Sequence, residues 1–223
     1  MTAAIVRFSE QMSHDELLDQ FAEFDTPLVS DALDEAGIDG VLAGLPPVRP
    51  EYDAVGRARP IRIERVEDTD QVNFPSEMLT QFRADEFLVI ASGTDDLSCW
   101  GGMASRLAAR EGVRAALIDG GFRDVPQIRR GSFPVFGRKP TPKTGQGRLR
   151  VVSTSDPVTI DDVEIHTDDV VVADATGVTV VPSGDAEVVL ETARRIDDDE
   201  SSLVSAIETG RGVAEIDDEF DHF

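Results

Sequence analysis

Residues 116–124 read Ala116-Leu117-Ile118-Asp119-Gly120-Gly121-Phe122-Arg123-Asp124, an apolar run followed by two glycines, a cation and an anion. The apolar run is typical of a buried strand, and the glycines favour a tight turn because glycine adopts positive φ without steric cost. The polar pair would then lie at the carboxyl end of the strand, the edge at which open α/β sheets bind their ligands. The stretch therefore predicts an α/β sheet with ligand chemistry at its edge.

Arg123 and Asp124 together suggest a site for an anion and a metal ion. The planar guanidinium of Arg123 can bind a carboxylate or phosphate through two hydrogen bonds. The carboxylate of Asp124 offers hard oxygen ligands of the kind that Mg²⁺ prefers, and Mn²⁺ binds similar ligands. A salt bridge within the loop, or a cap for the next helix, accounts at least as well for such a pair. These two residues alone do not identify a function.

The sequence around this stretch predicts a strand–helix–strand unit. Residues 86–91 form a compact apolar run, residues 100–110 follow a helical pattern that stops at a glycine, and residues 115–118 form the next strand. Two strands joined in this way normally run parallel. A further helix is predicted over residues 126–130 and a strand over residues 135–137.

Helices are predicted at both ends of the chain, and we interpret residues 1–223 as a single domain. The N-terminal helices cover about residues 13–37, and a C-terminal helical extension of one or two helices covers about residues 185–210. Short strands are predicted between them, over residues 54–58, 61–65, 149–152, 158–160, 163–166, 170–173 and 178–181.

The composition limits the partners and the compartment. The formal net charge is −23, which argues against nucleic acid or an anionic membrane as a partner because both require basic surfaces. Asp is abundant, and Lys139 and Lys143 are the only lysines, a composition similar to that of proteins from salt-loving organisms. Cys99 is the only cysteine, so a disulfide within the chain and a thiolate zinc site are excluded, and a packed role is expected for it. We expect a soluble cytoplasmic protein.

The chain resembles the RraA-like family, which includes class II 4-hydroxy-4-methyl-2-oxoglutarate aldolases and oxaloacetate decarboxylases. Gly102 is separated by twenty residues from Arg123-Asp124, as in the G-x20-R-D pattern of that family. Further similar segments lie along most of the chain, namely Leu28-Val29-Ser30-Asp31-Ala32-Leu33-Asp34 with Gly37, Val55-Gly56-Arg57-Ala58, residues 131–136, Val170-Val171-Val172-Ala173-Asp174, and Gly177-Val178-Thr179-Val180-Val181-Pro182.

The resemblance implies a fold and a set of site residues. The fold would be a swivelling β/β/α sandwich with flanking N- and C-terminal helices, assembled as a homotrimer or a hexamer with active sites between subunits. Arg123 would bind the carboxylate of a pyruvyl group, and Asp124 would hold the divalent cation. The backbone amides of Gly102, Met103 and Ala104 would complete the anion site, which helix N-termini favour in any family. Glu200 from a neighbouring subunit would hold the cation through a water molecule.

The resemblance also implies a reaction. The chain would be a lyase dependent on Mg²⁺ or Mn²⁺ that cleaves a small 4-hydroxy-2-oxo acid to pyruvate, and it would decarboxylate oxaloacetate through the same enolate. No lysine Schiff base is needed. Two other functions belong to the same family: a protein-binding regulator that inhibits RNase E, and a menaquinone methyltransferase. The second has little support, because the glycine-rich loop that cradles S-adenosylmethionine is missing.

Two positions depart from the pattern of that family. Many of its aldolases have an acidic residue where this chain has Gly102, and the motif R-D-x2-E/D ends here in Gln127. A glutamine side chain can form hydrogen bonds but carries no charge. Asp95 and Asp96, which precede the central helix, are possible replacements, although a solvated loop in an acidic protein explains them equally well.

Overall fold

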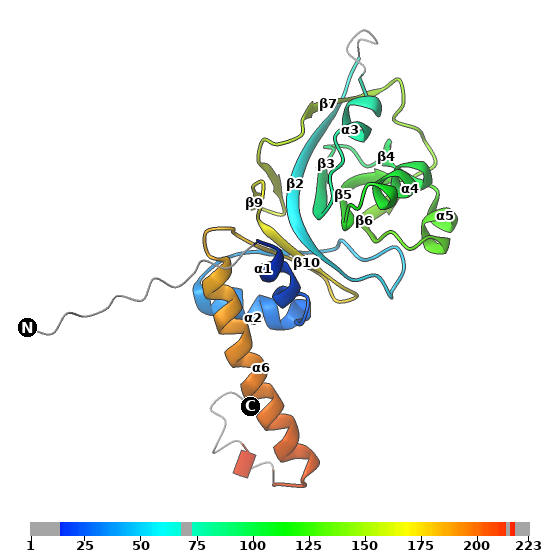
Figure 1. The fold of residues 1–223 in the computed structure, drawn as a ribbon. Coiled ribbons are helices and arrows are strands. Elements are labelled where there is room, and N and C mark those ends of the chain that lie inside the picture. Colours follow the sequence, from blue (N-terminus) through cyan, green and yellow to red (C-terminus); the bar gives the residue numbers. More distant parts are fainter. Residues whose placement is uncertain (1–13, 68–72, 213–214, 217–223) are drawn as a thin grey trace, which may run out of the picture.

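The computed structural model describes residues 14–67, 73–212 and 215–216. Within them, helices surround one large mixed sheet, which confirms the predicted α/β class (Figure 1). The strands are β1 (Val41–Leu42), β2 (Ala54–Arg65), β3 (Glu86–Ala91), β4 (Ser98–Trp100), β5 (Ala115–Phe122), β6 (Val135–Pro140), β7 (Leu149–Ser153), β8 (Val158–Ile160), β9 (Val163–Ile165), β10 (Val170–Ala173) and β11 (Val178–Val181). The helices are α1 (His14–Phe21), α2 (Thr26–Ala36), α3 (Ser76–Leu79), α4 (Gly102–Arg110), α5 (Val125–Arg130) and α6 (Ala186–Glu208).

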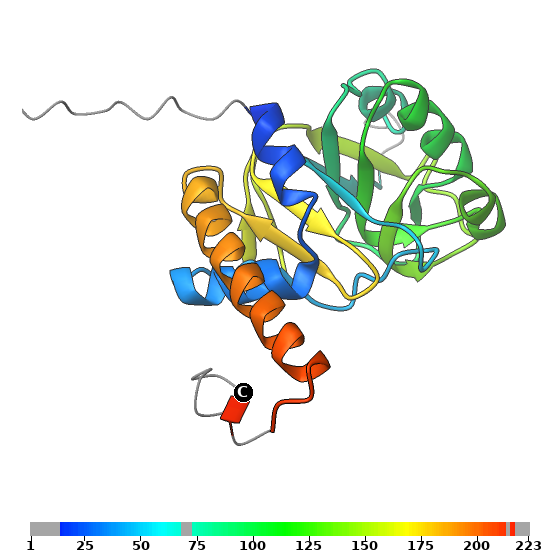
Figure 2. The same cartoon turned by 60° about the horizontal axis from the view of Figure 1, so that its bottom comes forward.

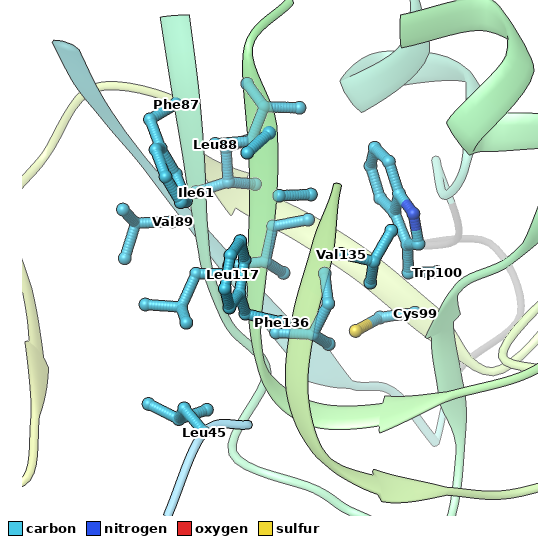
Figure 3. Packing of buried hydrophobic residues seen from close by; sticks show 14 of the residues in the cluster. Leu45, Ile61, Phe87, Leu88, Val89, Cys99, Trp100, Leu117, Val135 and Phe136 are labelled. Atoms are coloured by element: carbon cyan, nitrogen blue, oxygen red, sulfur yellow. The ribbon is translucent and has the colours of Figure 1, made fainter. Parts of the chain in front are cut away.

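In the part of the chain that the structure describes, the large sheet has the order β1-β11-β10-β2-β3-β5-β4, with β6 beside β5 and β7 beside β2. The predicted parallel pairing of β3 with β5 is confirmed, since Phe87 lies opposite Ala115 and Ile90 opposite Ile118. Both strands are apolar on both faces, as expected for parallel strands that are covered on two sides. Figure 3 shows part of the core that they form with β2, β4 and β6.

The strand β5 is longer than the sequence predicts, and it contains both glycines. Neither Gly120 nor Gly121 has positive φ, so the predicted tight turn is wrong. The glycines are required because neighbouring segments approach the backbone closely. A Cβ atom at Gly120 would lie 1.9 Å from Oγ of Ser92, and one at Gly121 would lie 2.4 Å from the carbonyl oxygen of Leu97. The close approach is made by the protein and not by a ligand.

The strand β2 continues through Pro60, where the sequence predicted two separate strands. Proline cannot donate a backbone hydrogen bond, which normally interrupts a central strand. Here β10 pairs with residues 54–57 and β7 pairs with residues 62–65 on one edge of β2, whereas β3 pairs with the other edge across Pro60. Pro60 therefore lies in the gap between β10 and β7, where the missing N–H group costs no hydrogen bond to either strand.

The helical predictions hold with changed ends. Trp100 belongs to β4, and α4 begins only at Gly102. The C-terminal extension is one helix of 23 residues, α6. Figures 1 and 2 show α1, α2 and the first half of α6 packed at the β10 and β11 end of the sheet, where Phe21, Leu33 and Leu190 are fully buried. Among the described residues, no helix combines the length and the apolar content that crossing a membrane would need.

Cys99 has the packed role that the sequence suggests. Its side chain is buried in β4 next to the core (Figure 3). Burial raises the pKa of the thiol to about 12, because a thiolate would lose its hydration there. The thiol therefore stays protonated at neutral pH, and nucleophilic chemistry at Cys99 is disfavoured.

Candidate active site

Arg123 and Asp124 lie where β5 ends and α5 begins, as the sequence predicts. The amide of Arg123 donates to the carbonyl oxygen of Trp100 over 3.0 Å, so the ends of β5 and β4 are held together. Asp124 has φ 62° and ψ 31°, the left-handed conformation, which Asp and Asn tolerate better than most residues. This backbone conformation turns the chain from the strand into the helix and directs the carboxylate toward the start of α4.

The carboxylate of Asp124 is only partly satisfied by the protein. Its Oδ2 accepts a hydrogen bond from the amide of Gly102 at 3.1 Å and lies 3.7 Å from Nε of Arg123. No described residue donates to Oδ1, and one third of the side chain is exposed. Although Asp124 precedes α5, its side chain makes no capping hydrogen bond to that helix. Asp124 therefore occupies the N-cap position of α5 through its backbone only, and its side chain forms a long ion pair with Arg123.

The amides at the start of α4 divide into two groups. Gly102, predicted as a free anion donor, already donates to Asp124. The amides of Met103 and Ala104 belong to the first turn of the helix, where no carbonyl one turn earlier can accept from them. Met103 is strongly exposed, and both residues line the same pocket as Arg123. An anion at this helix end would therefore find two amides and one guanidinium.

A small cavity of about 100 Å³ surrounds this group of residues, and we call it the strand-end pocket. Besides Arg123 and Asp124, its walls include Phe74, Met78, Trp100, Gly101, Met103, Ala104, Thr144 and Gln146. Met78 comes from α3, a helix of four residues that is too short to have a measurable periodicity and was not predicted. The charged side chains that line the pocket, among the residues described, are Arg123 and Asp124.

Two glycines permit the close packing at the start of α4. A Cβ atom at Gly101 would lie 2.8 Å from Oδ2 of Asp124. One at Gly102 would lie 2.4 Å from Oε1 and 3.0 Å from Cβ of Gln127. The two positions that depart from the pattern of the resembled family are thus in contact, because the side chain of Gln127 fills the space next to Gly102.

Asp95 and Asp96, the possible replacements for the missing acid, lie outside the strand-end pocket. Asp95 forms an ion pair with Nζ of Lys139 at 2.7 Å. Asp96 forms ion pairs with Arg65 and, at 3.5 Å, with Lys143. Both aspartates thus lie in a loop where Arg65, Lys139 and Lys143 are their counter-ions.

Glu200 is exposed on the second half of α6. Figures 1 and 2 show this half of the helix extending away from the sheet and from α4. Within one chain Glu200 therefore does not reach the strand-end pocket. A role there requires a second subunit, as the resemblance implies.

The donor set suits a hard divalent cation that is shared with a substrate. No group of three or more His, Cys, Asp or Glu side chains able to hold a metal ion occurs among the described residues. Mg²⁺ is commonly held by one or two carboxylates, with substrate oxygens and water completing its coordination. Asp124, whose Oδ1 has no donor among the described residues, can supply one such ligand.

Comparison with known proteins gives a consistent result. The sequence matches the family described as "RraA-like: Aldolase/RraA" over residues 26–180. It is 29% identical over 196 residues to a Halalkalibacterium halodurans protein named "Putative 4-hydroxy-4-methyl-2-oxoglutarate aldolase", a match that covers 86% of this chain and 89% of that protein.

Two solved structures have similar folds over almost their whole length. An uncharacterized protein from Pseudomonas syringae pv. tomato has a TM-score of 0.84 at 27% identity, covering 96% of this chain and 98% of that one. Streptomyces coelicolor RraAS2, described as an unusual member of the RNase ES inhibitor RraA protein family, has a TM-score of 0.77 at 25% identity, covering 86% of this chain and 98% of that one.

Proposed function

Because this chain belongs to the RraA-like, Aldolase/RraA family, we propose that it is a carbon–carbon lyase that cleaves a small 4-hydroxy-2-oxo acid to pyruvate. 4-Hydroxy-4-methyl-2-oxoglutarate is the proposed substrate type, and oxaloacetate is the proposed decarboxylation substrate. The observation that carries the proposal is the half-satisfied carboxylate of Asp124 beside the guanidinium of Arg123 in the strand-end pocket.

The residues of the strand-end pocket have distinct roles in this proposal. Arg123 binds the substrate carboxylate through its two-pronged guanidinium, assisted by the amides of Met103 and Ala104. Asp124 holds Mg²⁺ or Mn²⁺, which would stabilise the negative charge that develops on the 2-oxo group. The interaction of Gly102 with Asp124 fixes the carboxylate so that Oδ1 remains available to the cation.

Among the described residues, the strand-end pocket of one chain lacks a group that could accept a proton from the substrate, which is why we propose an assembly of several subunits. Its charged side chains within one chain are Arg123 and Asp124, and neither is suited to take the proton of the 4-hydroxyl group. We propose that Glu200 of a neighbouring subunit approaches the pocket and positions a metal-bound water there, in a homotrimer or a hexamer. The acidic surface fits a protein working in a salty cytoplasm, where ions screen charge repulsion.

The test follows pyruvate formation from oxaloacetate and from 4-hydroxy-4-methyl-2-oxoglutarate in molar KCl, with Mn²⁺ and without it. Wild type is compared with Asp124→Asn, which keeps the left-handed backbone accessible. Metal-dependent turnover that Asp124→Asn abolishes is the expected result. Turnover no higher than that of free metal would refute the lyase proposal for these substrates.

A second candidate function is a protein-binding regulator of ribonuclease activity. The similarity to Streptomyces coelicolor RraAS2 over almost its entire length supports it. A purified RNase E-type enzyme is the appropriate partner, measured by complex formation and by inhibition of RNA cleavage. Tight inhibition that survives Asp124→Asn, together with no turnover in the lyase assay, would reverse the order of the two candidates.

A further inference from the structure

A second cavity, of about 600 Å³, lies between α4 and α5, and we call it the α4–α5 cavity. Figure 1 shows the two helices side by side at the β4–β6 end of the sheet. Its walls include Gly102, Ser105, Arg106, Gln127, Arg130 and Ser132. Ligand pockets in proteins typically have volumes of about 300–1,000 Å³, so the cavity can accept a small molecule.

The charge of this cavity is opposite to that of the whole protein. The chain has 44 acidic and 21 basic residues, yet the charged side chains lining the cavity are Arg106 and Arg130. Neither forms an ion pair or a hydrogen bond with another described residue. Most other arginines are paired, as is Arg138 with Asp119 and Asp161. In an acidic protein, two unpaired arginines facing one cavity leave a positive charge that a ligand can neutralise.

Neutral polar groups complete the cavity wall. The carboxamide of Gln127 has no hydrogen-bond partner within the described residues, and it can rotate to present its amide hydrogens. Gly102 adds no side chain, and the side chain of Gln127 fills the space that a Cβ atom at Gly102 would take. A carboxylate at either position would place negative charge in the cavity. The glycine and the glutamine therefore keep the cavity suited to an anion.

We propose that the α4–α5 cavity is a second oxyanion site, in which Arg106 and Arg130 bind a carboxylate or a phosphate group and Gln127 donates to it. The site adjoins the strand-end pocket, because Gly102 lines the cavity and donates to Asp124. The oxyanion is either the far carboxylate of a substrate held at Arg123 or a separate small anion. Binding can be measured without turnover, so the proposal does not depend on the lyase activity.

The experiment is calorimetric titration with inorganic phosphate at constant ionic strength, set with KCl, because simple charge screening would otherwise mimic specificity. The double variant Arg106→Gln/Arg130→Gln should bind phosphate at least about tenfold more weakly, since it loses two charge-assisted interactions. Arg83→Gln is the matched control, because Arg83 is also exposed and unpaired among the described residues but lies outside the cavity. Its affinity for phosphate should equal that of wild type.

A further variant and two ligands decide the remaining points. Gln127→Glu should weaken phosphate binding in a protein with all arginines intact, which covers the case that the double variant folds poorly. If 2-oxoglutarate displaces phosphate from wild type but not from Arg123→Gln, and pyruvate does not displace it, the oxyanion is the far carboxylate of the substrate. If neither displaces phosphate, the site takes a separate anion. Equal phosphate binding by wild type, the double variant and Arg83→Gln, or no binding by wild type, overturns the proposal.

Discussion

Asp124 and Asp174 each follow a buried strand, β5 and β10, but the protein uses the two carboxylates differently. Both oxygens of Asp174 are occupied: Oδ2 accepts from the amide of Thr26, and Oδ1 accepts from the hydroxyl of Thr26 and from the amides of Thr176 and Gly177. Among the described residues, Asp124 has one backbone donor on Oδ2 and none on Oδ1. The carboxylate of Asp174 joins α2 to the sheet. In the function proposed above, the open oxygen of Asp124 binds the cation.

The pKa of Asp174 agrees with its structural role. Partial burial raises the pKa of this carboxyl, but the hydrogen bonds from Thr26, Thr176 and Gly177 outweigh burial, so that the net shift is downward. A carboxylate that the chain saturates with donors is held in its charged form and serves the fold. The comparison suggests that donor count separates a structural aspartate at a strand end from one that is open to a ligand.

The largest effect is expected for Asp124→Asn on activity. Asparagine retains the shape and tolerates the left-handed backbone, but it lacks the charge that attracts a divalent cation. A metal ion that stabilises developing charge contributes several kcal/mol, so turnover should fall roughly 100-fold or more. The measurement is kcat for pyruvate formation over a range of Mn²⁺ concentrations.

Thermal unfolding of the same variant provides the control. If Asp124 serves ligand binding, Asp124→Asn should leave the midpoint of unfolding in metal-free buffer nearly unchanged. A large fall in that midpoint would show that Asp124 is as structural as Asp174, and the comparison between the two aspartates would fail.

Asp174→Asn should have the opposite result, with a loss of stability and little change in activity per folded molecule. The substitution replaces one acceptor oxygen by an NH2 group. That group faces the amide of Thr26 if it replaces Oδ2, or the amide of Thr176 if it replaces Oδ1. Buried or partly buried donors without acceptors cost about 1–3 kcal/mol each, so unfolding free energy should fall by about 2–3 kcal/mol. Urea unfolding measures it, and an unchanged urea midpoint would contradict the structural role.

Sequence reasoning succeeded where local patterns are strong. The apolar runs of β3 and β5 predicted two buried parallel strands, and the resemblance of the flanking segments predicted the family. The same patterns failed for Gly120 and Gly121, because glycine is required both by a turn and by a close approach such as that of the loop between β3 and β4. They also failed at Pro60. There β2 continues because β10 pairs with the residues before the proline and β7 pairs with the residues after it.

The candidate site was predictable only where it depends on a local pattern. The Arg123-Asp124 pair could be located from a strand end and a spacing. The contact between Gly102 and Gln127 could not, because it joins α4 to α5 through a turn whose geometry depends on the left-handed backbone of Asp124. The walls formed by α3 and by Thr144 came from segments without periodicity. Neither the strand-end pocket nor the α4–α5 cavity could be foreseen from charge counts alone.

The contribution of Asp174 to the stability of the protein should depend on pH. Because its folded pKa is lowered, the stabilisation by Asp174 is present above the unfolded pKa of about 4 and is lost as pH falls through the folded pKa. The difference in unfolding free energy between wild type and Asp174→Asn should therefore shrink as the pH falls below about 4. A difference that stays constant over this range would show that charge plays no part in its hydrogen bonds.

The smallest effect is expected for Thr26→Val, which removes one of the donors to Asp174 without changing the shape of a buried side chain. The amide of residue 26 still donates to Oδ2, so the unfolding free energy should fall by only about 1 kcal/mol. Thr179→Val is a matched control, because the hydroxyl of Thr179 is also buried but its hydrogen bond to Val172 is long, at 3.4 Å, and should contribute less. A double-mutant cycle with Asp174→Asn isolates the interaction, since Thr26→Val should cost less once the carboxylate is gone. If it costs the same in both backgrounds, the hydroxyl of Thr26 acts through packing, and the donor count no longer explains why Asp174 differs from Asp124.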